Sequence, residues 1–110
     1  MILKEAKKLF DKGAIFLDAR SSKKYKKLHI KGAYSFPVGS FDEYYKQFRK
    51  SNWKNTTIVL YCSGTGCRLS EKLARILQDK GYTNLVVFTE GIYVWRDAGY
   101  PVENDKNITE

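Results

Sequence analysis

The sequence predicts an α/β fold in which a mainly parallel central sheet is covered on both faces by helices. Two observations indicate this class. Short apolar stretches typical of buried strands, Ala14–Leu17, Thr57–Tyr61 and Asn84–Phe88, alternate with segments whose apolar residues recur at helical spacing. The chain has 110 residues, 43% of them hydrophobic, which is enough for one folded domain. We expect residues 1–103 to form this domain and residues 104–110 to form a polar, flexible tail.

The N-terminal part of the chain predicts a helix, a strand and a helical turn. Apolar residues at helical spacing predict a helix over residues 2–10, and Gly13 is suited to end it. The strand 14–17 follows, with Asp18 at its end. Serines at the start of residues 21–27 are suited to cap a short helical turn there. A helix followed directly by a buried strand begins the expected alternation.

The middle of the chain predicts an extended segment and a second amphipathic helix. Residues 33–37 are expected to be extended, and Pro37 restricts them to a short or edge strand. A helix is expected over residues 41–49. Ser40 precedes it, and Glu43 lies three residues later, so the pair matches a capping box.

The C-terminal half predicts two further buried strands, each followed by a helix. The strand 57–61 precedes a helix that ends at Gly81, and the strand 84–88 precedes a short helix that begins at Gly91 and ends near Gly99. The first of these helices carries its apolar residues on one face: Leu69, Leu73, Ile76 and Leu77.

The composition of the chain argues against several classes of protein. The formal net charge is +8, and lysines concentrate between Lys23 and Lys31. No basic motif interleaved with aromatic residues accompanies them, so we interpret this as a solvated basic surface and expect no nucleic-acid partner. No apolar stretch approaches transmembrane length and the first residues are charged, so we expect a cytoplasmic protein without membrane contact.

Cysteine and histidine are scarce in this chain. Two cysteines, Cys62 and Cys67, are too few for a disulfide framework, and they do not form a CxxC pair. His29 is the single histidine, so the chain offers too few ligands for a zinc site. We therefore expect no bound metal.

Residues 61–70, Tyr-Cys-Ser-Gly-Thr-Gly-Cys-Arg-Leu-Ser, carry the main functional prediction. Cys62 follows a buried strand, a glycine-containing loop comes next, and a helix begins after the loop. This order directs backbone N–H groups and the positive end of a helix dipole toward one point. A thiol at that point is shifted toward the reactive thiolate, and an anion such as phosphate, sulfate or thiosulfate is bound in the same place. The segment predicts an enzyme whose chemistry takes place on the sulfur of Cys62.

Three blocks of the sequence together resemble the rhodanese family of sulfurtransferases. The block 16–33 contains Phe-Leu-Asp-Ala-Arg, then Tyr25, then His-Ile-Lys-Gly-Ala, and is similar to the family pattern Asp-x-Arg … Tyr … His-Ile-x-Gly-Ala. The second block is Cys62 at the end of a strand. The block 90–102 contains Glu-Gly-Ile-Tyr-Val-Trp and Ala-Gly-Tyr-Pro-Val, similar to the family's closing Gly-Gly … Trp … Gly-Tyr-Pro. The resemblance covers residues 16–102 and implies a three-layer α/β/α rhodanese-like fold.

The resemblance also implies a reaction. The Cys62 thiolate would take the outer sulfur of a small anionic donor such as thiosulfate and hold it as a persulfide. A thiophilic acceptor, which is cyanide, a thiol or a protein, would then remove that sulfur. The family implies no cofactor. Carried over by position, the substrate-binding loop would consist of Ser63, Gly64, Thr65, Gly66, Cys67 and Arg68.

The length of this loop leaves two other functions open. From Cys62 to Arg68 there are seven residues, whereas many sulfurtransferases of the family have six. The longer spacing resembles the rhodanese-related cell-cycle phosphatases and the general tyrosine-phosphatase pattern, so a phosphatase or arsenate reductase is one alternative. A non-catalytic or redox-sensing module with the same fold is the other.

Five residues besides Cys62 are singled out, with different expected roles. Cys67 is either a redox partner that forms a disulfide with Cys62 or a small side chain that fills the loop. Arg68 is expected to bind the anionic donor through its guanidinium fork. Ser70 is a candidate hydrogen-bond donor to the thiolate. Asp18 and Arg20 are expected to support loops near the site.

His29 is expected to be hydrogen-bonded to backbone rather than to act as a base. A thiolate that is already stabilised by backbone N–H groups does not need a general base.

Overall fold

The structure is a computed structural model, and it describes residues 2–105. Four parallel strands form the central sheet in the order β3-β1-β4-β5. Their bounds are β1 Ile15–Asp18, β3 Tyr34–Ser35, β4 Ile58–Tyr61 and β5 Leu85–Phe88. The predicted parallel sheet is therefore confirmed, and each of its four strands overlaps a segment predicted to be extended, with β1 one residue longer at its C-terminal end.

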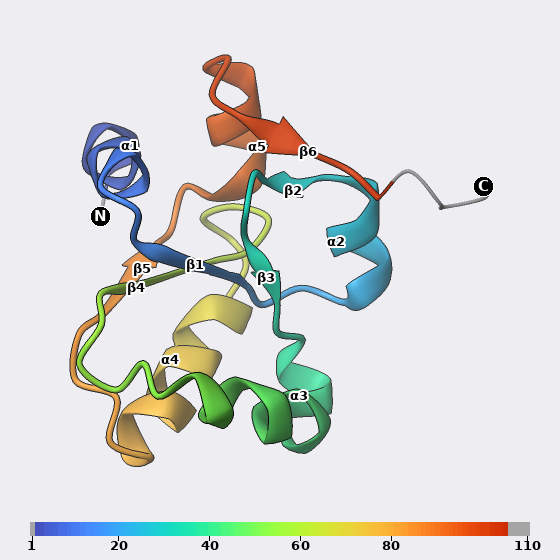
Figure 1. The fold of residues 1–110 in the computed structure, drawn as a ribbon. Helices are drawn as coiled ribbons and strands as arrows, with labels where there is room; N and C mark the ends of the chain where they lie inside the picture. Colours follow the sequence, from blue (N-terminus) through green and yellow to red (C-terminus); the bar gives the residue numbers. More distant parts are fainter. Residues whose placement is uncertain (1, 106–110) are drawn as a thin grey trace.

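Helices cover both faces of the sheet, which gives three layers (Figure 1). One face carries α1 and α5, and the other carries α3 and α4. The helix bounds are α1 Leu3–Asp11, α2 Ser22–Lys27, α3 Phe41–Phe48, α4 Leu69–Asp79 and α5 Gly91–Asp97. The predicted α/β/α architecture is thus confirmed. The side chain of Ser21 accepts a hydrogen bond from the backbone N–H of Lys24, so the predicted cap of α2 is present.

The core has two parts because side chains of the central strands alternate between the two faces of the sheet. Phe16 and Val59 pack under α1 and α5, together with Trp95, whose indole N–H donates to the carbonyl of Pro101 at 2.8 Å. Leu17 and Leu60 pack on the opposite face against α3 and α4. All of these side chains are buried. Strand β4 is buried along its whole length, as expected for a central strand with helices on both sides.

A second, two-stranded antiparallel sheet was not predicted. It pairs β2 His29–Ile30 with β6 Val102–Glu103. The Glu103 carboxylate accepts from the backbone N–H of Gly32 at 3.0 Å and lies 3.1 Å from His29 Nε2. His29 Nδ1 lies 2.6 Å from the carbonyl oxygen of Tyr25. The expectation that His29 hydrogen-bonds to backbone is confirmed, and its second nitrogen helps to join the C-terminal strand to the domain.

Two local predictions are wrong. The side chain of Ser40 makes no cap hydrogen bond, because a 3₁₀ turn, η1 Val38–Ser40, leads directly into α3 and Ser40 lacks the extended conformation that a capping residue needs. Strand β5 is not fully buried, because it lies at the edge of the sheet and only Phe88 is fully enclosed.

Helix α4 buries only part of the apolar face that was predicted for it. Leu73 and Leu77 are buried as expected, whereas Leu69, the first residue of the helix, is 38% exposed. Its position at the helix start places it beside the loop that precedes α4.

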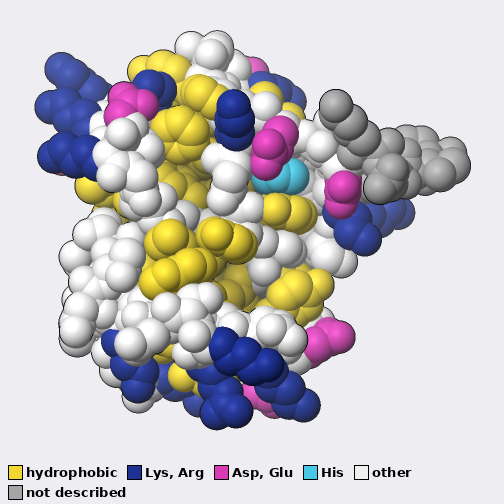
Figure 2. Space-filling view, viewed as in Figure 1, with side chains coloured by type: hydrophobic (Ala, Val, Ile, Leu, Met, Phe, Trp, Pro, Cys, Tyr) yellow, Lys and Arg dark blue, Asp and Glu magenta, His cyan; other side chains and the backbone are white. Residues whose placement is uncertain are grey.

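The surface seen in Figure 2 carries apolar side chains near its centre, between the upper and lower layers, and basic side chains in separate groups around them. Among the apolar residues at the sheet edge, Tyr34 of β3 is 51% exposed.

In residues 2–105, none of the helices has the length and apolar content needed to cross a bilayer. Only residues 104 and 105 of the expected tail are described, so its flexibility stays a prediction and residues 106–110 lie outside the described part.

Candidate active site

The apolar strand β4 places Cys62 at the edge of the sheet where the parallel strands end. Tyr61, the last residue of β4, pairs in register with Asp18 on one side and with Phe88 on the other. Cys62 comes next and is 1% exposed. Functional groups of open parallel sheets gather at this carboxyl edge, so the fold brings Cys62 and Asp18 to the same edge as predicted.

The loop between Cys62 and α4 rises from the core to the surface. A turn closes it, in which the backbone N–H of Cys67 donates to the carbonyl of Gly64 at 2.9 Å. Ser63 and Gly64 are half-buried, whereas Thr65 and Gly66 are exposed. The loop therefore has a buried sulfur at its base and an accessible outer part.

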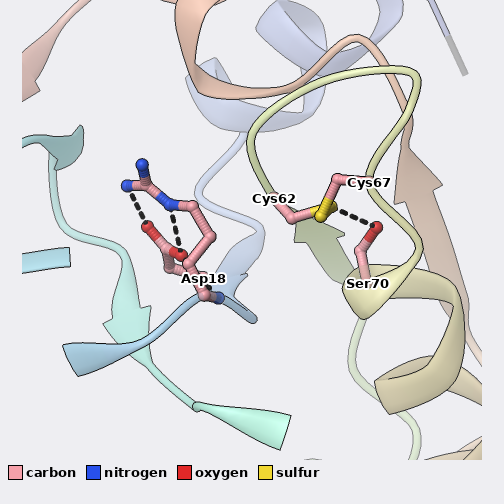
Figure 3. Close-up of a disulfide and its surroundings, with 5 residues drawn as sticks. Asp18, Cys62, Cys67 and Ser70 are labelled. Atoms are coloured by element: carbon pink, nitrogen blue, oxygen red, sulfur yellow. Dashed lines mark hydrogen bonds and ion pairs between the residues drawn. A yellow bond between two sulfur atoms is a disulfide. The ribbon is translucent and has the colours of Figure 1, made fainter. Parts of the chain in front are cut away.

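Cys62 and Cys67 are joined by a disulfide, with their Cα atoms 6.3 Å apart (Figure 3). Cys67 is half-buried, in contrast to Cys62. The buried Ser70 Oγ lies 3.4 Å from Cys62 Sγ. The structure thus has the loop in an oxidised form, the pairing expected if Cys67 is a redox partner.

The start of α4 supplies the remaining predicted loop residue. Arg68 occupies the N-cap position, and its side chain is exposed without an ion-pair partner in residues 2–105. A cation at the start of a helix opposes the helix dipole. An anion bound at this position would offset that cost.

Asp18 and Arg20 form a buried ion pair beside the loop. Arg20 donates from Nε to Asp18 Oδ1 at 3.0 Å and from a terminal nitrogen to Oδ2 at 2.8 Å, and its backbone N–H also donates to Oδ1. The same guanidinium donates to the carbonyl of Leu28. Figure 3 shows the Asp18 carboxylate turned away from the disulfide. These contacts favour the supporting role over a catalytic one.

The charges of this pair shape the local pKa values. Burial by itself lowers the pKa of Arg20, but the hydrogen bonds and charge of Asp18 outweigh it and raise the pKa above its ordinary value. Burial, followed by the negative charge of Asp18, raises the pKa of Tyr61 well above its ordinary value. Tyr61 is therefore neutral at physiological pH, and its hydroxyl accepts from the backbone N–H of Ile30 at 3.0 Å.

The sequence model of the rhodanese-like domain family matches residues 3–98 of this chain. The chain belongs to the rhodanese-like domain family. No curated protein sequence matches it significantly. A crystal structure of a Bacillus halodurans protein superposes with a TM-score of 0.82 at 27% identity, and the match covers 96% of this chain and 76% of the other.

Two further solved structures share the fold of this rhodanese-like domain. The rhodanese-like domain of an Anabaena protein has a TM-score of 0.79 at 21% identity, over 99% of this chain and 82% of the other. A rhodanese-related protein from Thermoplasma volcanium has a TM-score of 0.75 at 20% identity, over 94% of this chain and 95% of the other. The α/β/α architecture thus recurs in chains of low sequence identity.

Gly91 is a residue of the site whose importance was missed from the sequence. A Cβ at Gly91 would lie 2.6 Å from the carbonyl oxygen of Cys62 and equally close to the backbone of Ser63. Its φ is +77°, in the region that favours glycine, and the next residue, Ile92, donates its N–H to the Cys62 carbonyl at 3.0 Å. The start of α5 therefore buttresses the base of the loop. The glycine of the Glu-Gly pair in the family-like closing block marks this position in the sequence, but it does not show what Gly91 packs against.

Replacing Gly91 with alanine is expected to destabilise the domain and displace the Cys62 loop. Gly99→Ala is the matched control, because Gly99 also has a positive φ of +82° but nothing within 4 Å of its added Cβ. Gly99→Ala should cost about 1–2 kcal/mol from backbone strain. Gly91→Ala should cost roughly 1–3 kcal/mol more from overpacking. Equal free energies of unfolding in urea for the two variants would contradict the buttressing role.

A hollow of about 420 Å³ lies at the same edge of the sheet. Ala19, Pro37 and Leu69 belong to its lining, along with several serines, but none of residues 62–68 does. The hollow adjoins the start of α4 and leaves the disulfide outside it.

In residues 2–105, no group of three or more His, Cys, Asp or Glu side chains is placed to hold a metal ion.

Proposed function

We propose that this rhodanese-like domain is a sulfurtransferase that carries sulfane sulfur on Cys62. The observation that supports it most is the position of Cys62, buried at the carboxyl end of the central strand of a rhodanese-like fold and followed by a loop and the N-terminus of α4. A cysteine in such surroundings is stabilised as a thiolate. The family includes sulfurtransferases, and the chemistry that they perform requires this residue type.

The proposed cycle has two sulfur exchanges. The Cys62 thiolate attacks the outer sulfur of thiosulfate, a Cys62 Sγ–sulfur bond forms, the sulfur–sulfur bond of the donor breaks, and sulfite leaves with the electron pair. A nucleophilic acceptor such as cyanide then attacks the outer sulfur, and Cys62 leaves as the thiolate. Neither exchange requires a cofactor. The same chemistry fits a thiol or a protein cysteine as the acceptor.

The remaining loop residues have binding roles in this proposal. The loop N–H groups other than that of Cys67, which donates to the Gly64 carbonyl, stabilise the negative charge of the thiolate and of the persulfide together with the N-terminus of α4. Ser70, 3.4 Å from Cys62 Sγ, is placed to donate a hydrogen bond to the thiolate. Arg68 attracts the anionic donor. A disulfide-bonded Cys62 has no free thiolate, so the activity requires that the disulfide be reduced. We therefore propose that the protein works in the reducing cytoplasm.

Phosphate ester or arsenate chemistry is the competing proposal, based on the Cys62-to-Arg68 spacing. Hydrolysis of a phosphate ester benefits from a general acid that protonates the leaving group. Asp18 is held by Arg20, and Glu90 accepts from the backbone N–H of Leu3 at 2.6 Å, so these two carboxylates are already engaged. Sulfur transfer from thiosulfate needs no such acid, because sulfite leaves as an anion. The contacts therefore favour sulfur transfer.

A non-catalytic module with the same fold is the other competing proposal. Thiocyanate formation by the reduced protein from thiosulfate and excess cyanide tests the sulfurtransferase against it. Steady thiocyanate production above the buffer rate supports the enzyme. Hydrolysis of an aryl phosphate without any thiocyanate would instead support the phosphatase.

Arg68→Ala is expected to raise the KM for thiosulfate by roughly tenfold, with a smaller change in kcat, because the guanidinium attracts the donor before sulfur is transferred. Arg75→Ala is the matched control, since Arg75 is also an exposed arginine of α4 but lies two turns further along. Both constants are measured from initial rates of thiocyanate formation. An unchanged KM, or equal effects of the two substitutions, would remove Arg68 from donor binding.

A further inference from the structure

We infer that Cys67 discharges the Cys62 persulfide internally, so that the domain reduces sulfane sulfur to hydrosulfide and is regenerated by a dithiol. This inference rests on the proposed function, since it needs a persulfide on Cys62, and it specifies what happens to that sulfur. It adds a reductive activity, in which the second loop cysteine acts when no external acceptor is present in large excess. The reductant is identified by its chemistry as a dithiol, either a small molecule or a protein.

The disulfide itself is the first observation. Cys67 lies five residues after Cys62, and the two Cα atoms are 6.3 Å apart, within the range that a disulfide spans. The Cys67 N–H donates to the Gly64 carbonyl, and this turn folds the loop back over its first residue. The fold of the loop therefore allows Cys67 to reach the sulfur of Cys62.

The proposed step balances without an added oxidant. In the persulfide, Cys62 Sγ is bonded to one outer sulfur. The Cys67 thiolate attacks Cys62 Sγ, the Sγ–Sγ bond forms, and the bond to the outer sulfur breaks. The outer sulfur leaves with the electron pair and, after taking up a proton, is hydrosulfide. The sulfane sulfur is reduced, and the two cysteine thiols are oxidised to the disulfide.

The geometry favours attack on the inner sulfur. Attack on the outer sulfur would only move the persulfide from Cys62 to Cys67, whereas the bond recorded in the structure is between the two cysteine sulfurs themselves. Cys62 is 1% exposed and Cys67 is half-buried at the end of the loop turn. Because Cys67 is tethered to the same loop, its effective concentration near Cys62 exceeds that of a dilute dissolved acceptor, and only an acceptor in large excess, such as the cyanide of the rate assay, competes with it.

The difference in exposure also gives the direction of regeneration. A dithiol reaches Cys67, which is half-buried, before Cys62, which is enclosed. Its attack on Cys67 leaves a mixed disulfide there and releases Cys62 as the thiolate, beside Ser70 Oγ and the N-terminus of α4. The second thiol of the reductant then releases Cys67 and completes its own oxidation to a disulfide. Cys62 is therefore the first residue returned to its reactive form.

A single-turnover experiment tests the inference. The protein is reduced with dithiothreitol, freed of reductant under anaerobic conditions, and mixed with thiosulfate and, separately, with glutathione persulfide. Hydrosulfide is trapped with a bimane reagent and quantified, and the intact mass of the protein is recorded before and after cyanide is added. Wild type and Cys67→Ser are compared, with circular dichroism as the check that the variant is folded.

The expected wild-type result is about one equivalent of hydrosulfide per chain and a protein that has lost two hydrogens. Cys67→Ser should gain one sulfur atom instead, release roughly a tenth of that hydrosulfide or less, and return to its starting mass with cyanide. Addition of dithiothreitol to the discharged wild type should restore a second turnover.

Two results would overturn the inference while the proposed function stands. In one, the wild type keeps the added sulfur until cyanide removes it, as the variant does. In the other, Cys67→Ser releases hydrosulfide as fast as the wild type. If neither protein gains sulfur or loses hydrogens with either donor, the proposed function fails and the inference fails with it, and the recorded masses distinguish that case from the other two.

Discussion

Cys62→Ser is expected to lower the rate of thiocyanate formation by at least about a thousandfold, to the rate of the uncatalysed reaction. A serine hydroxyl is not ionised at neutral pH and is a poor nucleophile toward sulfur, so no persulfide can form. Cys62 is enclosed, and serine has nearly the same volume, so the core around it should stay packed. Initial rates with reduced protein at excess cyanide measure the effect.

Cys67→Ser is the matched control for this loss, because it removes the other cysteine of the same loop. Cyanide in excess captures the persulfide sulfur from outside, so Cys67→Ser should still produce thiocyanate. The reverse pattern, with activity retained in Cys62→Ser and lost in Cys67→Ser, would mean that Cys67 carries the sulfur. Matching far-UV circular dichroism of both variants would attribute the losses to chemistry rather than to unfolding.

Asp18→Asn is expected to destabilise the domain by about 3–5 kcal/mol, because it leaves the guanidinium of Arg20 buried without its counter-charge. The exposed fractions of the two side chains are 0% for Asp18 and 2% for Arg20, so water cannot replace the lost carboxylate. Domains of this size are stable by roughly 5–15 kcal/mol. The substitution should therefore remove a large part of the free energy of unfolding.

Asp11→Asn is the control for an ion pair at the surface. Asp11 accepts from Lys7 on α1 at 2.8 Å, but its side chain is 57% exposed, so its loss should cost less than about 1 kcal/mol. Urea unfolding of both variants, in the reduced state, measures the two free energies. A similar small cost at Asp18 and Asp11 would contradict the supporting role assigned to the buried pair.

Much of the fold was predictable because it depends on local apolar patterns. The buried β4 and the core position of Trp95 follow from continuous or periodic apolar residues. The position of β5 at the sheet edge was not predictable, because an edge strand and a central strand have similar apolar sequences. The sheet formed by β2 and β6 was missed because each strand has two residues and its partner is remote in the sequence.

The candidate site shows the same division between local and remote information. Cys62 followed by a loop and a helix is a local pattern, and its position at the end of β4 was predicted. The packing of Gly91 against the Cys62–Ser63 peptide joins segments that are remote in the sequence, and no pattern in either segment determines it. The sequence left the role of Cys67 open between a redox partner and a filler, because spacing alone does not determine whether two sulfurs meet.

The most direct test of the central claim, that Cys62 carries sulfane sulfur, is the intact mass of reduced Cys67→Ser after incubation with thiosulfate. This variant is used because its persulfide cannot be discharged by Cys67. The account predicts a gain of one sulfur atom that cyanide removes as thiocyanate, and no gain in a variant that also carries Cys62→Ser. An unchanged mass in the single variant, or the same gain in the double variant, would contradict the assignment of Cys62.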